Sequence, residues 1–311
     1  MKLVTFESGH ARHIGALLSD GKTIADFTAS APASAHFRDM LALIDGGDAA
    51  MAEAKALVAA PKVSVALADV RLLAPLPEPR QMRDFLCFEQ HLRQARANRY
   101  LFGGGDPVDP ATIELPQVWY DQPIYYKCNR FSVIGTGQDV LWPRYCKLLD
   151  YELEFGAILG KGGKNVRRED ARSMIFGYVI FNDMSARDAQ MKEMAGQLGP
   201  AKGKDFDTGN IIGPWLVTAD EIPDPYNLTM IARVNGEEWS RGNSGSMGHK
   251  FEDVIVHVSN EETLYAGEFL GSGTVGNGCG LELGRFLKPG DVVELEIDGL
   301  GILRNKVVSQ E

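Results

Sequence analysis

The sequence predicts a β-rich α+β protein made of two unequal parts, and three observations support this fold class. The chain has 311 residues, which suits two domains or one large domain with an appendage. Three prolines stand close together in residues 73–79 and indicate an extended connector, because each proline fixes φ and removes a backbone donor. From residue 130 onward, most of the chain reads as short strands separated by Gly and Pro. We therefore expect a small N-terminal domain at 1–75 and a larger domain at 76–311.

The smaller unit is expected to mix strands and helices. Short strand-like segments occur at Lys2–Phe6 and Ile14–Leu18, and an Ala-rich helical stretch follows at Met51–Ala60.

After the connector, apolar residues recur at the spacing of an amphipathic helix across Met82–Tyr100. Residues 101–118 are rich in Gly, Pro and Asp, which is typical of a loop.

The larger unit is expected to be mainly β-structure. One helix is predicted within it, because four apolar residues fall on one face of Phe251–Val258. The predicted strands are Ser132–Gly135, Tyr151–Leu159, Phe176–Phe181, Trp215–Thr218, Thr229–Val234 and Val292–Ile297.

Charge and cysteine usage exclude several classes of protein. The chain has 32 Lys and Arg against 42 Asp and Glu, a net charge of −10, which argues against binding to nucleic-acid phosphates. We see no apolar run of about 18 residues, so no membrane span is expected, and the N-terminus does not resemble a secretory signal. The four cysteines are far apart and form no CxxC pair, which is typical of reduced thiols in a cytoplasmic protein.

Three carboxylates form the clearest candidate for a chemical site. Glu152 and Glu154 fall on the same face of a predicted strand, where they repel each other unless water or a cation lies between them. Asp183 ends an apolar run that we expect to be a buried strand. Carboxylate oxygens suit Mg²⁺ or Mn²⁺ better than Zn²⁺. The alternatives are a solvated strand face for the glutamates and a helix N-cap for Asp183.

Two further residues are candidates on weaker grounds. His91 precedes the predicted loop, which would act as a lid, and Lys204 lies in a segment that could hold a substrate carboxylate. For both, an ordinary solvated or packed side chain is the alternative. The segment 271–276 satisfies the GxGxxG pattern, but no helix is expected after it, so we reject a dinucleotide fold.

Taken together, these residues resemble the fumarylacetoacetate hydrolase family over residues 82–308. The segments that carry the resemblance occur in the family's order along the chain. They are Met82–Phe85 with His91, Leu149–Glu154, Ile175–Tyr178, Asn182–Gln190, Gly203–Thr208, Ile212–Trp215, Gly271–Thr274 and Phe286–Asp291.

The resemblance implies a β-sandwich roll in the C-terminal domain, a homodimer, and a Mg²⁺ or Mn²⁺ ion bound by the three carboxylates. It also implies that His91 on the lid helix is the catalytic histidine. The substrate, a 2-oxo acid, would contact a set of polar residues in the C-terminal domain. Arg187, Gln190, Lys204, Thr274 and Lys127 are the candidates.

The resemblance further implies an enzyme of aromatic catabolism that hydrolyses the C–C bond of a 2,4-dioxo acid such as an acylpyruvate. Family members pair the histidine with a glutamate, whereas Gln94 and Val292 occupy the places where we expect it. Gln94 would orient His91 without charge, and Glu89 is the acidic substitute nearest in sequence. The missing glutamate favours, as the alternative, a decarboxylase, isomerase or hydratase of a related 2-oxo acid. A non-catalytic protein that binds a metabolite and a metal is the third hypothesis.

Overall fold

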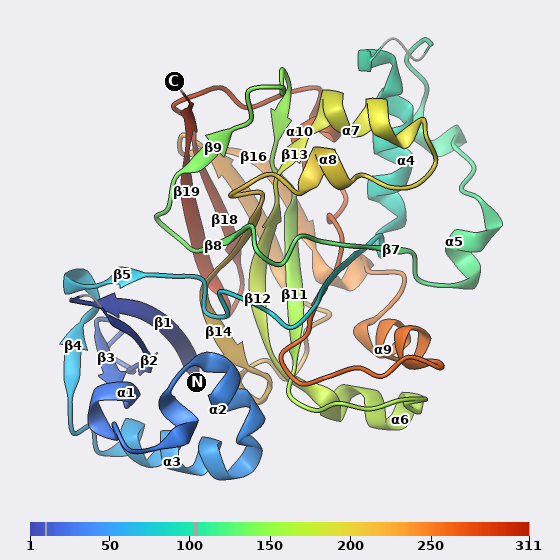
Figure 1. The fold of residues 1–311 in the computed structure, drawn as a ribbon. Helices are drawn as coiled ribbons and strands as arrows, with labels where there is room; N and C mark the ends of the chain where they lie inside the picture. The colour runs from blue at the N-terminus through green and yellow to red at the C-terminus, as the bar shows by residue number, and fades with distance from the viewer. Residues whose placement is uncertain (10, 103–104, 311) are drawn as a thin grey trace.

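The computed structural model describes residues 1–9, 11–102 and 105–310, and Figure 1 shows how their elements are arranged. Within these ranges the protein has two large β-sheets and one two-stranded ribbon, with helices around them. Among the described residues there is no helix long and apolar enough to cross a membrane. The predicted class, mixed sheets with helices, is confirmed.

The larger sheet has twelve strands. They are β1 (Lys2–Ser8), β2 (Ala11–Leu17), β3 (Thr23–Asp26), β4 (Ser64–Ala66), β5 (Arg71–Leu72), β6 (Met82–Phe85), β7 (Tyr125–Lys127), β8 (Val133–Ile134), β11 (Leu153–Leu159), β12 (Ile175–Asp183), β14 (Asn210–Thr218) and β17 (Phe269–Gly271). Their order is β4-β3-β2-β1-β14-β12-β11-β17-β6-β7, with β5 paired to β1 and β8 paired to β14. The sequence-distant strands β6, β17, β11 and β12 are therefore neighbours.

The second sheet has five strands and packs against the first. It consists of β9 (Val140–Trp142), β15 (Thr229–Val234), β16 (Glu237–Asn243), β18 (Val292–Ile297) and β19 (Gly301–Ser309), in the order β16-β15-β18-β19-β9. The ribbon pairs β10 (Leu149–Asp150) with β13 (Ser185–Ala186).

The two sheets share one hydrophobic core. Residues of β15 and β18 alternate between buried and partly exposed positions, as expected for strands with one face on a core. Met230 and Leu295 from these strands belong to the same buried cluster as Phe155 and Tyr178 of the larger sheet. The central strands of the larger sheet are buried along almost their whole length, which fixes the positions of the polar residues at their ends.

Ten short α-helices complete the chain within the described residues. They are α1 (Phe27–Ser30), α2 (Met40–Asp45), α3 (Gly47–Ala59), α4 (Glu89–Ala97), α5 (Gln117–Asp121), α6 (Arg168–Ala171), α7 (Arg187–Met194), α8 (Ala201–Lys204), α9 (Phe251–Ser259) and α10 (Gly280–Leu283). Figure 1 shows α4, α7, α8 and α10 at the upper end of the central strands, with α1, α2 and α3 at the lower left.

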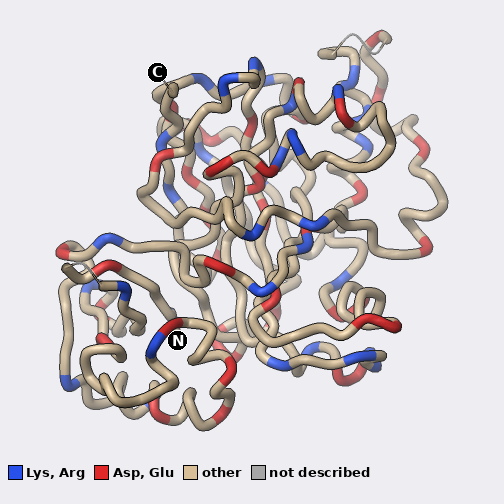
Figure 2. The backbone as a smooth tube through the Cα atoms, viewed as in Figure 1, with Lys and Arg blue, Asp and Glu red and all other residues tan. Residues whose placement is uncertain are grey.

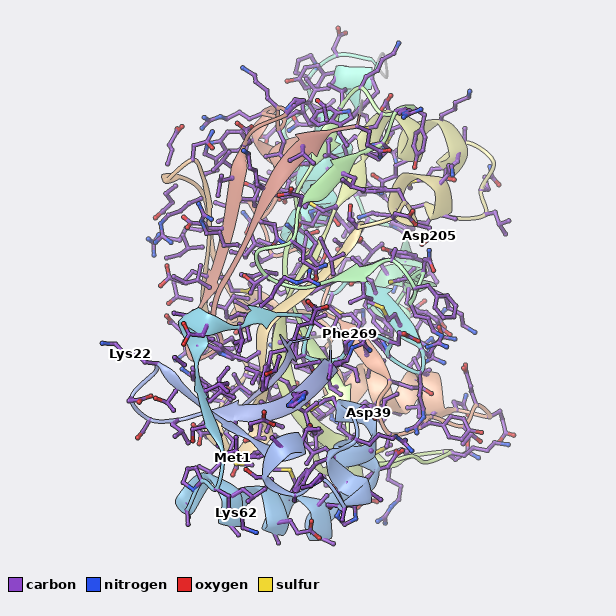
Figure 3. The ribbon with its side chains drawn as sticks, turned by 60° about the vertical axis from the view of Figure 1, so that its left-hand side comes forward. Met1, Lys22, Asp39, Lys62, Asp205 and Phe269 are labelled. Atoms are coloured by element: carbon purple, nitrogen blue, oxygen red, sulfur yellow. The ribbon has the colours of Figure 1, made fainter. Side chains whose placement is uncertain are left out.

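The N-terminal unit extends the larger sheet. Strand β1 pairs antiparallel with β14, with Leu3 opposite Leu216. Phe269, labelled in Figure 3, belongs to a buried cluster that also contains Phe27 and Leu43 of the N-terminal helices. Strands from both sides of residues 75 and 76 share one sheet, so the sheet does not mark a boundary there. The predicted domain boundary stays a prediction.

One predicted helix is wrong in its first part. Residues 82–85 form strand β6, and the helix begins only at Glu89. Strand β6 pairs in parallel with β17, with Asp84 opposite Gly271, and antiparallel with β7. The apolar spacing of this segment suits a helix, but pairing with strands distant in the sequence overrides local periodicity.

Candidate active site

Three buried carboxylates converge at the ends of neighbouring strands. Asp84 on β6, Glu154 on β11 and Asp183 at the end of β12 each place an oxygen within 4.8 Å of the other two. Figure 2 shows acidic positions in the centre of the view as well as at its rim. The sheet order explains the cluster, because β17 alone separates β6 from β11 and β12 lies directly beyond β11.

A glycine on the intervening strand leaves room for this cluster. A Cβ atom added at Gly271 would collide with Oδ1 of Asp84. Any other residue at this position would therefore displace the carboxylate or the strand. The same segment also holds Asp84 in place, because Gly273, two residues after Gly271, donates its N–H to Asp84 Oδ1 at 3.2 Å.

The cluster fits a hard divalent cation. Glu154 Oε2 and Asp183 Oδ1 are buried and have no hydrogen-bond partner among the described residues. Burial and the charge of Glu152 raise the pKa of Asp84 to about 6 and that of Asp183 to about 8, although Lys204 opposes both shifts. Burial, Asp84 and Glu152 raise the pKa of Glu154. Mg²⁺ and Mn²⁺ prefer oxygen ligands, and a bound cation would offset the repulsion between these three carboxylates.

These pKa shifts predict how metal binding depends on pH. A carboxyl group with a raised pKa holds its proton more tightly in the folded chain than in the unfolded one. Ionising Asp84 and Asp183 therefore destabilises the metal-free protein as the pH rises from their ordinary 3.8 through about 6 and about 8. A bound cation favours the ionised forms, so the stabilisation by Mg²⁺ should grow between about pH 5 and about pH 8. Thermal unfolding with Mg²⁺ and with a chelator measures this, and a constant difference in Tm across that range would contradict it.

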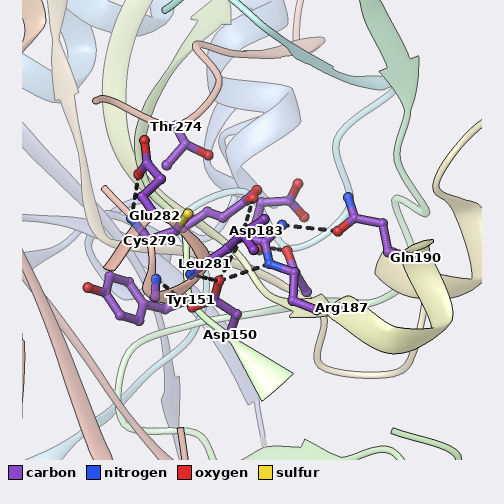
Figure 4. Close-up of polar contacts among 12 residues, drawn as sticks. Asp150, Tyr151, Asp183, Arg187, Gln190, Thr274, Cys279, Leu281 and Glu282 are labelled. Atoms are coloured by element: carbon purple, nitrogen blue, oxygen red, sulfur yellow. Dashed lines mark hydrogen bonds and ion pairs between the residues drawn. The ribbon is translucent and has the colours of Figure 1, made fainter. Parts of the chain in front are cut away.

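Two buried cationic side chains, Lys204 and Arg187, contact Glu152, and Lys204 also contacts Asp183. Lys204 Nζ lies 2.6 Å from Glu152 Oε2 and 2.6 Å from Asp183 Oδ2. Arg187 lies 2.7 Å from Glu152 Oε1 and 2.8 Å from Asp150 Oδ2. Burial opposes ionisation of Glu152, but the two cations outweigh it and lower its pKa. Figure 4 shows the ion pairs of Arg187 and the nearby Asp183.

Of the three metal ligands predicted from the sequence, two lie in the carboxylate cluster and the third, Glu152, does not. The structure brings Glu154 and Asp183 together with Asp84, while both oxygens of Glu152 contact cationic side chains. Sequence reasoning gave Asp84 no role. The one signal for it is an acidic residue in the four-residue segment Met82–Phe85, all of which is buried.

His91 has a carboxylate partner, contrary to the interpretation drawn from Gln94 and Val292. His91 Nδ1 lies 3.3 Å from Glu282 Oε1, and both side chains are buried. Glu282 is held by backbone donors, because Asn277 N donates to its Oε1 at 3.2 Å and Cys279 N donates to its Oε2 at 3.0 Å. The partner was missed because it lies almost two hundred residues away, on the four-residue helix α10.

The structure does not bring the other two predicted partners to His91. Gln94 Nε2 donates to Asn277 Oδ1 at 2.5 Å, and its Oε1 accepts from Asn277 N at 3.1 Å. It thereby ties α4 to the loop that carries the glutamate. Glu89 instead accepts from Arg93 at 2.6 Å and from the Tyr120 hydroxyl at 3.0 Å.

A cavity of ≈ 440 Å³ lies between the carboxylate cluster and His91, and Asp84 and Glu154 are among its lining residues. His91, Arg187, Gln190, Lys204 and Thr274, all predicted from the sequence, line it. Thr274 Oγ1 donates to Glu154 Oε1 at 3.2 Å, and Arg187 donates to Gln190 Oε1 at 3.0 Å.

Lys127, also predicted to contact the substrate, is exposed and does not line this cavity. Its neighbour Tyr126 faces inward on β7 and donates to Asp183 Oδ2 at 2.7 Å. The alternation of side chains along a strand explains the difference, since adjacent residues face opposite sides.

Comparison with known proteins decides the family. The model of the fumarylacetoacetate hydrolase C-terminal domain matches residues 81–308. The chain belongs to the fumarylacetoacetate hydrolase family. It is 32% identical to the mitochondrial oxaloacetate tautomerase Fahd2a of Rattus norvegicus, over 99% of this chain and 92% of that protein.

Two solved structures of the family extend this finding to the fold. The fumarylacetoacetate hydrolase of Exiguobacterium antarcticum is 27% identical with a TM-score of 0.74, and both chains are fully covered. A maleylpyruvate hydrolase from Sphingobium, solved with manganese(II) and pyruvate, is 25% identical with a TM-score of 0.76 and equal coverage. Relatives in this family thus include hydrolases, isomerases and tautomerases.

Proposed function

We propose that the protein is a metal-dependent hydrolase that cleaves the C–C bond of a 2,4-dioxo acid. The observation that carries this proposal is the contact between His91 and Glu282, 3.3 Å apart. A histidine backed by a carboxylate is a suitable general base for water, because the carboxylate stabilises the imidazolium that forms. The sequence had left His91 without such a partner, and this gap was the reason to keep a decarboxylase, isomerase or hydratase as the alternative to hydrolysis.

The residues of the site fit the steps of the reaction. His91 takes a proton from a water molecule, which adds to the carbonyl farther from the substrate carboxylate. The bond between that carbon and the adjacent CH₂ then breaks, and the electron pair remains on the departing enolate. Lys204 and Arg187 stabilise its negative charge. Protonation of the enolate carbon yields a 2-oxo acid and a carboxylic acid, so one water is consumed for each bond cleaved.

A divalent cation, when bound, polarises the 2-oxo and carboxylate oxygens of the substrate. Asp84, Glu154 and Asp183 would hold it. A manganese(II) complex of a relative supports a divalent metal in this family, without deciding between Mg²⁺ and Mn²⁺ here.

The outer part of the cavity indicates the nature of the acyl group. Arg96 and Arg99 also line the cavity, and much of the remaining wall consists of apolar side chains. Among them are Leu92, Ala95, Ile124, Met191, Met194 and Leu198. The apolar part of this wall suits an acylpyruvate whose acyl group carries apolar carbon, because burying that carbon is favourable.

Keto–enol tautomerisation of oxaloacetate is the second candidate. The relative from Rattus norvegicus that matches almost the whole chain is an oxaloacetate tautomerase. The same base would move a proton between carbon and oxygen without activating water. The decarboxylase and hydratase alternatives have lost their specific support, because Glu282 supplies the carboxylate that was thought to be absent. A homodimer, implied by the resemblance, and a cytoplasmic location, predicted from the cysteine usage, remain proposals.

A substrate panel separates these activities. We expect the Mn²⁺- or Mg²⁺-loaded protein to convert an acylpyruvate to pyruvate and a carboxylic acid, with turnover lost after chelation. Diketone absorbance and coupled pyruvate detection follow hydrolysis, and the ultraviolet absorbance of enol oxaloacetate follows tautomerisation. Rapid loss of the oxaloacetate enol with no release of pyruvate from any acylpyruvate would replace the first candidate by the second.

A further inference from the structure

A second group of potential metal ligands lies at the same cavity and has different donor chemistry. His91, Cys279 and Glu282 each offer one ligand atom, and these atoms lie within 4.8 Å of one another. All three residues are buried, with exposed fractions of 6%, 0% and 9%. The carboxylate cluster offers only oxygen, whereas this group combines nitrogen, sulfur and oxygen. Figure 4 shows Cys279 and Glu282 side by side.

One of these ligand atoms contacts a carboxylate without forming a hydrogen bond to it. His91 Nδ1 is buried and forms no hydrogen bond within the described residues, although Glu282 Oε1 lies 3.3 Å away. A buried polar atom without a hydrogen bond is unfavourable, because it has lost its bonds to water. A cation bound at this nitrogen would satisfy it, which is an indication of a ligand independent of the grouping itself.

The thiol and the carboxylate are held at fixed positions relative to each other. Cys279 is the N-cap of α10, where its sulfur accepts from the backbone N–H of Glu282. In return, Cys279 N donates to Glu282 Oε2 at 3.0 Å. This reciprocal capping places both ligands on one turn, while the histidine comes from α4, which contacts α10.

We propose that His91, Cys279 and Glu282 bind a thiophilic divalent cation, Zn²⁺ or Cd²⁺, as an inhibitory site. The neutral imidazole and the carboxylate coordinate directly, while the thiol coordinates as thiolate and releases one proton to solvent. Nitrogen and sulfur donors select Zn²⁺ and Cd²⁺, and the oxygen cluster selects Mg²⁺ or Mn²⁺. The inhibitory effect rests on the proposed function, because a cation at His91 removes the general base.

Cadmium absorbance tests the site without any assay of activity. Cd²⁺ bound to a thiolate gives an ultraviolet charge-transfer band, so titration of the Mg²⁺-loaded protein reports coordination by cysteine. The variant Cys279→Ser keeps a side-chain acceptor at the N-cap and removes the sulfur. The matched control is Cys146→Ser, which alters a buried cysteine outside both groups of potential ligands. We expect the band in wild type and C146S and its loss in C279S.

A second variant guards against a folding defect in the first. His91→Ala removes the nitrogen ligand without touching α10, and it should weaken Cd²⁺ binding by at least about 10- to 100-fold, the loss caused even by outer-shell changes. Thermal unfolding confirms that each variant is folded. A band of equal strength in C279S, or no band in wild type, would refute the site.

Inhibition is measured separately on an acylpyruvate. Added Zn²⁺ should inhibit wild type and C146S in excess Mg²⁺, and C279S should require at least about 10-fold more Zn²⁺. Equal sensitivity of C279S would overturn the inhibitory role. If wild type shows the Cd²⁺ band but turns over no acylpyruvate, the proposed function fails while the metal site stands.

Discussion

Replacing Asp183 with asparagine is expected to abolish metal retention and to lower kcat/KM by at least about 10³-fold. Without the metal, the activation free energy rises by several kcal/mol, because the negative charge of the transition state is less stabilised. Each increase of about 1.4 kcal/mol slows the reaction about tenfold. Asp183 is central to the site, since it approaches two other carboxylates and contacts Lys204 and Tyr126. Metal content after dialysis, calorimetric Mn²⁺ binding and turnover measure the effect.

The variant Asp84→Asn is expected to behave in the same way. Its oxygen lies within the same 4.8 Å cluster as those of Glu154 and Asp183, yet its role came from the structure and not from the sequence pattern. The matched control is Glu169→Gln, an exposed carboxylate on α6 with 64% of its side chain accessible. Metal binding at the wild-type level in both Asp84→Asn and Asp183→Asn would refute the ligand assignment.

Side-chain alternation and local runs of apolar residues were enough to identify part of this site. Glu154 and Asp183 stand within or at the end of strongly apolar strands, so their burial follows from the pattern around them. The strands Thr229–Val234 and Val292–Ile297 were predicted with the bounds that the structure has, because each has period-two apolar residues between clear turns. Of the residues that line the cavity, Arg187, Gln190 and Thr274 came from the resemblance alone.

What the sequence could not supply was pairing between distant segments. Asp84 joins the cluster only because β6 lies next to β17, which follows it by well over a hundred residues. Glu282 reaches His91 from a four-residue helix whose N-cap is a cysteine, a residue that rarely signals a helix start. No local pattern contains either contact, so both candidate site residues were missed while their neighbours were found.

Glu282 tests the proposed chemistry most directly, as a positioning residue that acts through His91. We expect Glu282→Gln to lower kcat by about 10²- to 10⁴-fold, because glutamine cannot stabilise the imidazolium by charge. His91→Ala should cause a loss in the same range. Metal retention should stay at the wild-type level in both variants, since neither residue belongs to the oxygen cluster.

The double variant His91→Ala/Glu282→Gln distinguishes this role from a merely structural one. If Glu282 acts only through the histidine, the double variant should be no slower than His91→Ala alone, because residues that work as a unit are strongly non-additive. If Glu282 merely supports α10, the two losses should multiply and the Tm of Glu282→Gln should fall. Gln90→Ala is the matched control, since Gln90 is an exposed residue of the same helix α4. Multiplicative losses in kcat would therefore separate Glu282 from catalysis, and with it the observation on which hydrolysis was preferred to tautomerisation.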